Sequence, residues 1–239
     1  MKPRLIFCMG GQENRFAKEA IAAKWEYGFR SREKCLDGVT NVTMIDVDWK
    51  KYDLDAHVRV VSEYRPWISV CPDIEDPARF SETLEAMYRM REAGSEHVMV
   101  VAKAEGIISL LPAENWIVLG YPIGPGEGTV NMWEVKESNF PVHLLGGSLP
   151  GQLKTMYHMN PGQVISGDMN GYTKAAQFGN TMQGLKLVKH PGKRHNGEGN
   201  IYEAFGVLAR HIYAQWQQLS VDVGNTYERP QRIGLEIQT

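Results

Sequence analysis

The stretch from Pro141 to Gly179 reads PVHLLGGSLPGQLKTMYHMNPGQVISGDMNGYTKAAQFG. It contains two short apolar runs that predict strands, Val142–Leu145 and Gln163–Ser166, and glycine follows each run at its carboxyl end. A helical segment, Pro150 to Tyr157, lies between the runs, and this order indicates a parallel strand–helix–strand unit. Ligand chemistry in such units collects where the strands end. The second strand places one carboxylate there, Asp168.

Asp168 has two interpretations on spacing alone. Asp is a favoured N-cap residue, and a helix is predicted from Tyr172, so the side chain fits a turn or a cap. Gly167 and Gly171 also fit a ligand-facing position, because glycine lets the backbone approach a ligand closely. Both interpretations are open at this point.

The same alternation of strands and helices continues through the rest of the chain. Apolar runs predict buried strands at residues 4–9, 42–45, 67–70, 97–102 and 116–119, with a weaker eighth strand at 185–188. Helices are predicted at residues 14–29, 53–64, 76–92, 107–111 and 201–218, and the tail at 221–239 has no assignment. Continuous apolar strands are expected when both faces of a parallel sheet are buried. The pattern predicts an α/β fold, and the strand number favours a single (β/α)₈ TIM-like barrel.

Length and charge limit the classes of protein that fit. The 239 residues are close to the ~250 of a typical TIM barrel, so one domain over residues 1–239 is predicted. The formal net charge of −2 argues against a surface covered in positive charge. Any contact with nucleic acid must therefore come from a local basic patch.

The cysteines indicate a reducing compartment, and the apolar windows are too short for a membrane span. Cys8, Cys35 and Cys71 are odd in number, far apart and form no CxxC pair, so neither a disulfide framework nor a structural zinc site is indicated. No window approaches the ~20 apolar residues of a membrane span. The amino terminus does not resemble a signal peptide. We expect a cytoplasmic protein with no membrane contact.

Several predicted strands end in carboxylates. Asp46 and Asp48 follow one strand, Asp73 another and Asp168 a third. In a barrel these ends meet at one mouth. Converging carboxylates repel each other unless a ligand or proton offsets the repulsion, and paired carboxylates suit chemistry at a glycosidic carbon. Asp46 or Asp48 also fits a solvated turn residue, and Asp73 fits a loop cap.

The run Gly167-Asp168-Met169-Asn170-Gly171-Tyr172-Thr173-Lys174 resembles the segment of tRNA-guanine transglycosylases that carries the nucleophilic aspartate. In that family the aspartate ends a barrel strand and a Thr-Arg pair follows, where this chain has Thr173-Lys174. The upstream VHLLGGS is similar to the family's strand that ends in a Leu-Met-Gly or Leu-Phe-Gly turn. The resemblance implies that Asp168 is a nucleophile and that Lys174 contacts substrate.

The other aspartates also have counterparts in this family. Asp46 lies where the family has the aspartate assigned to proton transfer, but the usual Asp-Ser-Gly-Gly is absent, so Asp48 is an alternative. The segment SVCPD resembles the strand whose aspartate holds the purine edge, which implies that role for Asp73.

Two further strands resemble the family's base-binding strands. HVMVVAKAEG resembles the Val-Val-Gln-Gly strand, with Lys103 in the place of the glutamine. IVLGYPIG resembles the strand whose backbone binds the base, which implies that Gly120 and Tyr121 bind it here. The family's cysteine-and-histidine zinc subdomain is absent from this sequence. A short, zinc-free chain looks more like the DNA-directed branch, the phage and bacterial enzymes that insert 7-deazaguanines into DNA.

A basic run lies near the carboxyl end of the barrel region. It contains Lys189, Lys193 and Arg194, which are candidate phosphate contacts because such contacts need cations and no sequence code. A solvated loop is an equally good interpretation. His143 and His158 lack a second ligand at metal spacing, so we interpret them as satisfied polar side chains and predict no metal site.

Three hypotheses follow from these observations. The first is a base-exchange transferase, in which Asp168 displaces guanine from DNA and a free 7-deazaguanine base then attacks the covalent intermediate. It needs no cofactor, and tRNA is the less favoured substrate. The second is a non-catalytic barrel subunit that binds nucleic acid or a partner, and the third is a glycoside hydrolase using the same carboxylates. A homo- or hetero-oligomer, in a bacterial cell or a phage-infected host, is compatible with all three.

Overall fold

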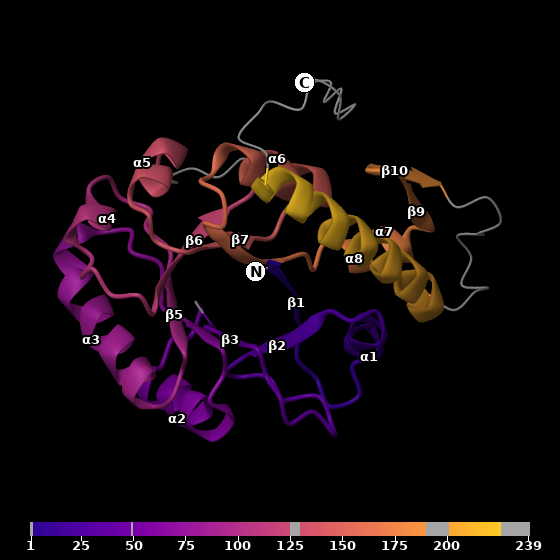
Figure 1. Cartoon of the computed structure of the whole chain (residues 1–239). Helices are drawn as coiled ribbons and strands as arrows, with labels where there is room; N and C mark the ends of the chain where they lie inside the picture. Colours follow the sequence, from indigo (N-terminus) through magenta and orange to yellow (C-terminus); the bar gives the residue numbers. More distant parts are fainter. Residues whose placement is uncertain (1, 49, 125–129, 190–200, 226–239) are drawn as a thin grey trace.

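Eight parallel strands close into a barrel in the computed structural model (Figure 1). The structure describes residues 2–48, 50–124, 130–189 and 201–225. Each strand pairs with the next along the chain, and the last pairs with the first. The strands are β1 (Arg4–Cys8), β2 (Glu26–Arg30), β3 (Met44–Asp46), β4 (Ile68–Val70), β5 (His97–Val100), β6 (Ile117–Pro122), β7 (Val142–Leu145) and β8 (Val164–Asp168). The predicted α/β barrel is confirmed.

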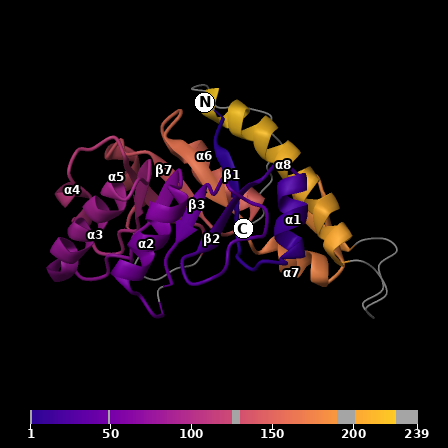
Figure 2. The same cartoon turned by 90° about the horizontal axis from the view of Figure 1, so that it is seen from below.

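Helices surround this barrel, as Figures 1 and 2 show from two directions. They are α1 (Arg15–Ala22), α2 (Leu54–Tyr64), the 3₁₀ turn η1 (Pro77–Arg79), α3 (Phe80–Glu92), α4 (Ile107–Leu110), α5 (Met132–Glu137), α6 (Leu149–His158), α7 (Tyr172–Gln177) and α8 (Ile201–Asn225). Local chemistry sets several starts: Asp53 caps α2 by accepting from the Ala56 N–H at 3.0 Å. Within the described residues, no helix combines the length and the apolar character needed to cross a membrane.

Two apolar layers hold the barrel together. Alternate strand residues such as Ile6, Met44 and Met99 form a small core inside the barrel. Their neighbours, such as Phe7 and Ile45, face outward and pack in a larger core between strands and helices. Because the inner core fills the barrel, chemistry is confined to the strand ends.

The helix predicted at residues 14–29 is wrong in its second half. Helix α1 ends at Ala22, Lys24 adopts a φ of 68°, and Glu26–Arg30 forms strand β2. The spacing of Tyr27 and Phe29 is the reason, because both pack outward with a period of two rather than along a helical stripe. Residues 31–43 then connect β2 to β3 without a helix.

The predicted eighth strand at residues 185–188 is also wrong as a barrel strand. Residues Lys186–Lys189 form β10, which pairs antiparallel with β9 (Asn180–Gln183) in a separate two-stranded sheet. Gly184 in the turn has a φ of 58°, which favours glycine in a tight hairpin. Strand β2 supplies the missing member of the barrel instead.

Helix α8 lies across the outside of the barrel and beside α1 (Figure 2). Two indole N–H groups fix it there: Trp216 Nε1 donates to the Pro3 carbonyl and Trp25 Nε1 to the Ala209 carbonyl, each at 2.9 Å. Both tryptophans are buried. Since Pro3 precedes β1, the contact ties α8 to the seam where β1 meets β8. The helix predicted at 201–218 is confirmed and extends to Asn225.

Candidate active site

The mouth formed by the carboxyl ends of the strands carries a polar ring. Strand β1 ends in Cys8, β2 in Arg30, β3 in Asp46 and β8 in Asp168. These strands are neighbours in the closed barrel. Because all eight strands are parallel, residues far apart in sequence meet at this one end.

Asp168 is a buried carboxylate with a specific set of hydrogen bonds. It is 8% exposed. Its Oδ1 accepts from the Gly146 N–H at 3.0 Å and lies 3.3 Å from His143 Nε2. Helix α7 begins instead with Gly171 as its N-cap and has no side-chain cap, so the interpretation of Asp168 as a helix cap is wrong.

The backbone around Asp168 is held by two amide side chains. Gln152 Nε2 donates to the carbonyls of Asp168 and Gly146, each at 2.7 Å. Asn170 joins β8 to β1, because its Oδ1 accepts from the Cys8 N–H at 3.1 Å and its Nδ2 donates to the Cys8 carbonyl at 2.7 Å. The carboxylate therefore sits on a rigid support.

Asp46 has a raised pKa. Burial is the main cause, and the negative charges of Asp168 and Asp73 add to it. The Val47 N–H and the Arg30 cation act in the opposite direction but are outweighed. The pKa of Asp46 is therefore raised to about 7. The Val47 N–H donates to Asp46 Oδ1 at 2.8 Å. A carboxyl group that titrates near neutral pH can both give and take a proton under working conditions.

Arg30 and Glu33 form an ion pair next to Asp46. Glu33 Oε1 accepts from Arg30 Nε at 3.1 Å, and Glu33 Oε2 accepts from the Gly10 N–H at 2.8 Å. Burial opposes the Glu33 charge, but the donors from Arg30 and Gly10 outweigh it and lower the pKa of Glu33. Arg30 and Asp46 stand side by side in the register of β2 and β3. The fixed cation thus limits the rise in the Asp46 pKa.

Cys8 lies at the same mouth, where its surroundings disfavour the thiolate. Burial, followed by the charges of Asp46 and Asp168, raises the pKa of its thiol well above the ordinary value. The thiolate is the reactive form, so the raised pKa argues against a nucleophilic role for Cys8. The cause of its shift also places Asp46 and Asp168 within electrostatic range of one thiol.

Asp73 and Lys103 contact each other directly. Lys103 Nζ lies 2.6 Å from Asp73 Oδ2 and 3.1 Å from Glu75 Oε1. The hydrogen bonds to Asp73 and Glu75 raise the pKa of Lys103 and outweigh its desolvation. A parallel bridge between Ile74 and Ala102 extends β4 and β5 and holds the two loops together. The two side chains that the resemblance predicts to bind a base therefore form one donor-and-acceptor unit.

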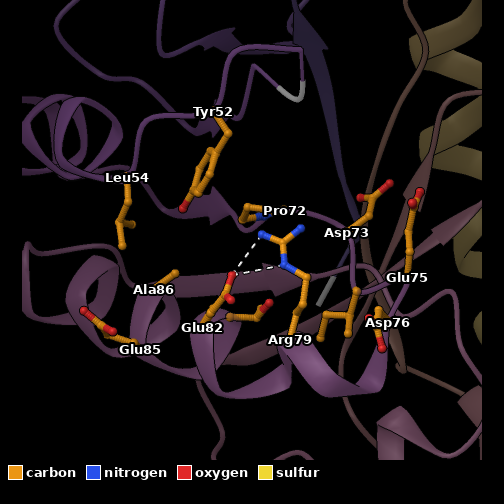
Figure 3. Close-up of a pocket in the computed structure, with 12 residues that line it drawn as sticks. Tyr52, Leu54, Pro72, Asp73, Glu75, Asp76, Arg79, Glu82, Glu85 and Ala86 are labelled. Carbon is orange, nitrogen blue, oxygen red and sulfur yellow. Dashed lines mark hydrogen bonds and ion pairs between the residues drawn. The ribbon is translucent and has the colours of Figure 1, made fainter.

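A pocket of about 610 Å³ lies on the outer side of Asp73. Figure 3 shows Asp73 and Glu75 at one side of it and Tyr52 at the other, with Arg79 and Glu82 paired between them. Most of the carboxylates around it are already engaged: Glu75 with Lys103, Glu82 with Arg79, and Asp76 with the Ala78 N–H. The pocket adjoins the mouth through Asp73 but does not include Asp46 or Asp168.

The remaining predicted residues are spread around the mouth. Asp48 Oδ1 accepts from the Lys50 N–H at 3.2 Å in a local turn. Gly120 is inside the barrel on β6, where an added Cβ would lie within 3.0 Å of Val101, Leu145 and Met99. Tyr121 follows it and is partly buried.

The predicted cationic contacts lie beyond β8. Lys174 is exposed on α7, and Lys189 ends β10, where Nζ lies 3.4 Å from the Phe178 carbonyl. Lys193 and Arg194 fall outside the described residues. Among the residues that are described, no group of three or more His, Cys, Asp and Glu side chains is arranged to hold a metal ion.

Sequence reasoning misses four polar members of the mouth: His143, Arg30, Glu33 and Asn170. Arg30 directly follows the over-long helix predicted at 14–29, so it is not recognised as a strand end, and Glu33 lies in the loop after it. His143 is interpreted from sequence only as a satisfied polar side chain. Its place two residues before the strand end at Leu145 is a signal that identifies it, because alternate residues share one face of a strand.

Comparison with known proteins adds a family but no activity. A family model described as a family of unknown function (DUF6610) matches residues 20–217. No curated protein matches the chain.

Proposed function

We propose that this chain, which belongs to the DUF6610 family of unknown function, is a base-exchange glycosyltransferase that replaces guanine in nucleic acid with a 7-deazaguanine. The observation that carries the proposal is the pair of unlike carboxyls at one barrel mouth. Asp168 Oδ1 accepts from the Gly146 N–H at 3.0 Å, and Asp46 has a pKa of about 7. Carboxyl groups whose environments differ in this way suit a nucleophile and a proton-transfer residue.

The first step is a displacement at the sugar. Asp168 attacks C1′ of a guanosine nucleotide, a C1′–O bond forms, and the C1′–N9 bond breaks with its electron pair on the departing guanine. Asp46 supplies a proton to that base, which its raised pKa permits at neutral pH. The product is a glycosyl ester on Asp168.

The second step reverses these roles. Asp46, now ionised, takes a proton from an incoming 7-deazaguanine, and the base nitrogen attacks C1′. The C1′–O bond breaks and its electron pair returns to the Asp168 carboxylate. Two displacements retain the configuration at C1′, as in double-displacement glycosidases.

Base recognition is assigned to the neighbouring strand ends. Lys103 offers N–H donors to a carbonyl such as guanine O6, while Asp73 accepts from ring and exocyclic N–H groups. Their 2.6 Å contact presents both kinds of group together. Gly120 and Tyr121 contribute backbone groups at the end of β6.

DNA is the proposed nucleic acid, with tRNA less favoured. Lys174 and Lys189 are exposed and follow Asp168 in sequence, and positive charge of this kind suits contacts with phosphates. On a duplex, the target base must leave the stack to reach a buried carboxylate. A single-stranded substrate avoids that cost.

Incorporation of radiolabelled guanine into unlabelled DNA tests this proposal without requiring a particular deazaguanine. We expect the natural chain to incorporate label into DNA. The rate of incorporation should fall by about 10⁴–10⁶-fold with Asp168→Asn, as when a catalytic nucleophile is lost. It should persist with Asp48→Asn. Asp48→Asn is the matched control, because its carboxylate serves a local turn.

Other outcomes of the same assay decide between the remaining hypotheses. Release of guanine without incorporation would identify a hydrolase. DNA binding with neither release nor incorporation would identify a non-catalytic subunit. Equal activity of Asp168→Asn and the natural chain would remove Asp168 from the chemistry.

A further inference from the structure

We infer that His143 is a positioning residue that selects Oδ2 of Asp168 as the attacking atom and stabilises the charge on Oδ1 when the glycosyl ester breaks. The inference rests on the proposed function, because it assigns a role within that reaction. It starts from a histidine that is 0% exposed and uses both ring nitrogens.

The three side chains are brought into line by an irregular strand pairing. His143 Nδ1 lies 2.7 Å from Ser166 Oγ, and Nε2 lies 3.3 Å from Asp168 Oδ1. Ser166 and Asp168 are two residues apart on β8 and therefore share one face. The register between β7 and β8 shifts between Val142 and His143, which sets His143 opposite Ser166. Such irregularities re-aim side chains near active sites.

Hydrogen-bond chemistry fixes the tautomer of the ring. An ionised carboxylate only accepts, so the proton of the Asp168 contact sits on His143 Nε2. In the neutral ring Nδ1 is then an acceptor, and the Ser166 hydroxyl donates to it. The Asp168 carboxylate thus fixes His143 as a donor at Nε2, because the other tautomer would set two acceptors against each other, and the Ser166 hydroxyl completes the pairing at Nδ1.

This arrangement makes the two carboxylate oxygens different. His143 Nε2 and the Gly146 N–H both donate to Oδ1. Within the described residues, no group donates a hydrogen bond to Oδ2, which is the oxygen left to form the bond to C1′. Donors on the opposite oxygen also orient the carboxylate without covering the attacking lone pair.

The same donors act most strongly when the ester breaks. In the covalent intermediate Oδ1 is an ester carbonyl oxygen with little charge. As the C1′–Oδ2 bond breaks, its electron pair returns to the carboxylate, and negative charge grows on Oδ1 between His143 and Gly146. Pre-positioned N–H donors stabilise developing charge of this kind. Loss of His143 should therefore slow breakdown of the ester more than its formation.

The first test compares His143→Leu with His143→Gln, using a single-stranded oligodeoxynucleotide that contains one guanine. Leucine removes both polar contacts, whereas the glutamine amide replaces them with one acceptor and one donor. For His143→Leu we expect exchange to fall by roughly 10²-fold, the loss typical of one oxyanion donor. The covalent protein–DNA band on a denaturing gel should grow, because the adduct forms faster than it breaks down.

His143→Gln should restore most of the exchange and keep the adduct near the natural level. His158→Gln, at the end of α6, is the control for histidine loss outside the mouth. A folded His143→Leu protein whose adduct forms and breaks down with the natural rates would overturn the inference. So would a folded His143→Gln protein as slow as His143→Leu.

The second test does not depend on activity. The ¹⁵N shifts of the His143 ring should show Nε2 protonated and Nδ1 unprotonated in the natural chain and also in Ser166→Ala, because the Asp168 carboxylate accepts from Nε2 in both. A proton on Nδ1 alone would overturn the inference even in an active enzyme. Failure of the natural chain to act on DNA would instead reject the proposed function, and the ring shifts would still decide whether His143 donates to Asp168.

Discussion

Asp46 is the residue whose protonation the proposed chemistry requires. Its pKa in the folded chain is about 7, against an ordinary value of 3.8. Between these values the folded state holds a proton that the unfolded state releases, so stability falls as pH rises through this window. Above about pH 7 the cost of burying the charge is fully present. The proton that makes Asp46 useful also stabilises the fold.

Replacement of Asp46 by Asn should therefore stabilise the chain in a pH-dependent way. The amide keeps the size of the side chain and never carries the charge. Relative to the natural chain, Asp46→Asn should gain stability progressively from about pH 4 to about pH 7. Urea unfolding at pH 4.5, 6 and 8 measures the gain. Asp168, Asp73 and Arg30, whose charges act on Asp46, are present in both proteins, so the difference isolates this carboxyl. A gain that stays constant with pH would contradict the assignment.

The residues at the strand ends can be predicted from the sequence. Which segments form the eight barrel strands can be predicted only in part. Seven barrel strands are visible as apolar runs. Strand β2 is not, because Trp25, Tyr27 and Phe29 also fit a helical composition when they follow the alanines of α1. The alternation of Tyr27 and Phe29 identifies a strand only when it is known that both side chains pack in the outer core. Residues 186–189 cause the opposite error, a barrel strand predicted where there is none, because nothing local in the sequence distinguishes a hairpin strand from a barrel strand.

Strand β6 provides a test of packing at the mouth. A Cβ at Gly120 would lie 2.8 Å from Val101 Cγ2 and 2.9 Å from Leu145 Cδ1. Gly120→Ala should cost about 1–3 kcal/mol of stability, the usual range for overpacking a core. Gly171→Ala is the matched control, because its φ of −59° suits alanine and no atom lies within 4 Å of the added Cβ. Thermal unfolding of both variants gives the comparison, and equal stability would place Gly120 outside the packed interior.

At the scale of the whole molecule, closure of the barrel is what creates the site. Parallel topology alone predicts that Asp46, Asp73 and Asp168 meet at one end, and this much is accessible from sequence. The interactions among the side chains are not. The His143–Ser166 pairing depends on a register shift between β7 and β8, and the Asp73–Lys103 pair depends on where two loops end. Neither leaves a local pattern in the chain.

The basic run after β8 is tested through the ionic strength of the solution. If Lys189, Lys193 and Arg194 bind phosphates, changing all three to Gln should lower the slope of log affinity against log salt by roughly 0.7–0.9 for each phosphate that is no longer neutralised. Fluorescence anisotropy with a labelled oligonucleotide at several salt concentrations measures this slope. The same change at Lys24, Arg65 and Lys154, three exposed cations elsewhere on the barrel, removes equal charge and should leave the slope nearly unchanged. Equal slopes for the two triple variants would favour the interpretation of the basic run as a solvated loop.

The proposed reaction requires that Asp168 becomes covalently attached to a nucleotide sugar. The most direct measurement incubates the chain with single-stranded DNA and no incoming base, denatures it, and locates the adduct by peptide mass spectrometry. We predict a single modified site on the peptide that contains Asp168, and its absence from Asp168→Asn. An adduct on Asp46 or Asp48, or no adduct from a protein that incorporates labelled guanine in the exchange assay, would contradict this role of Asp168.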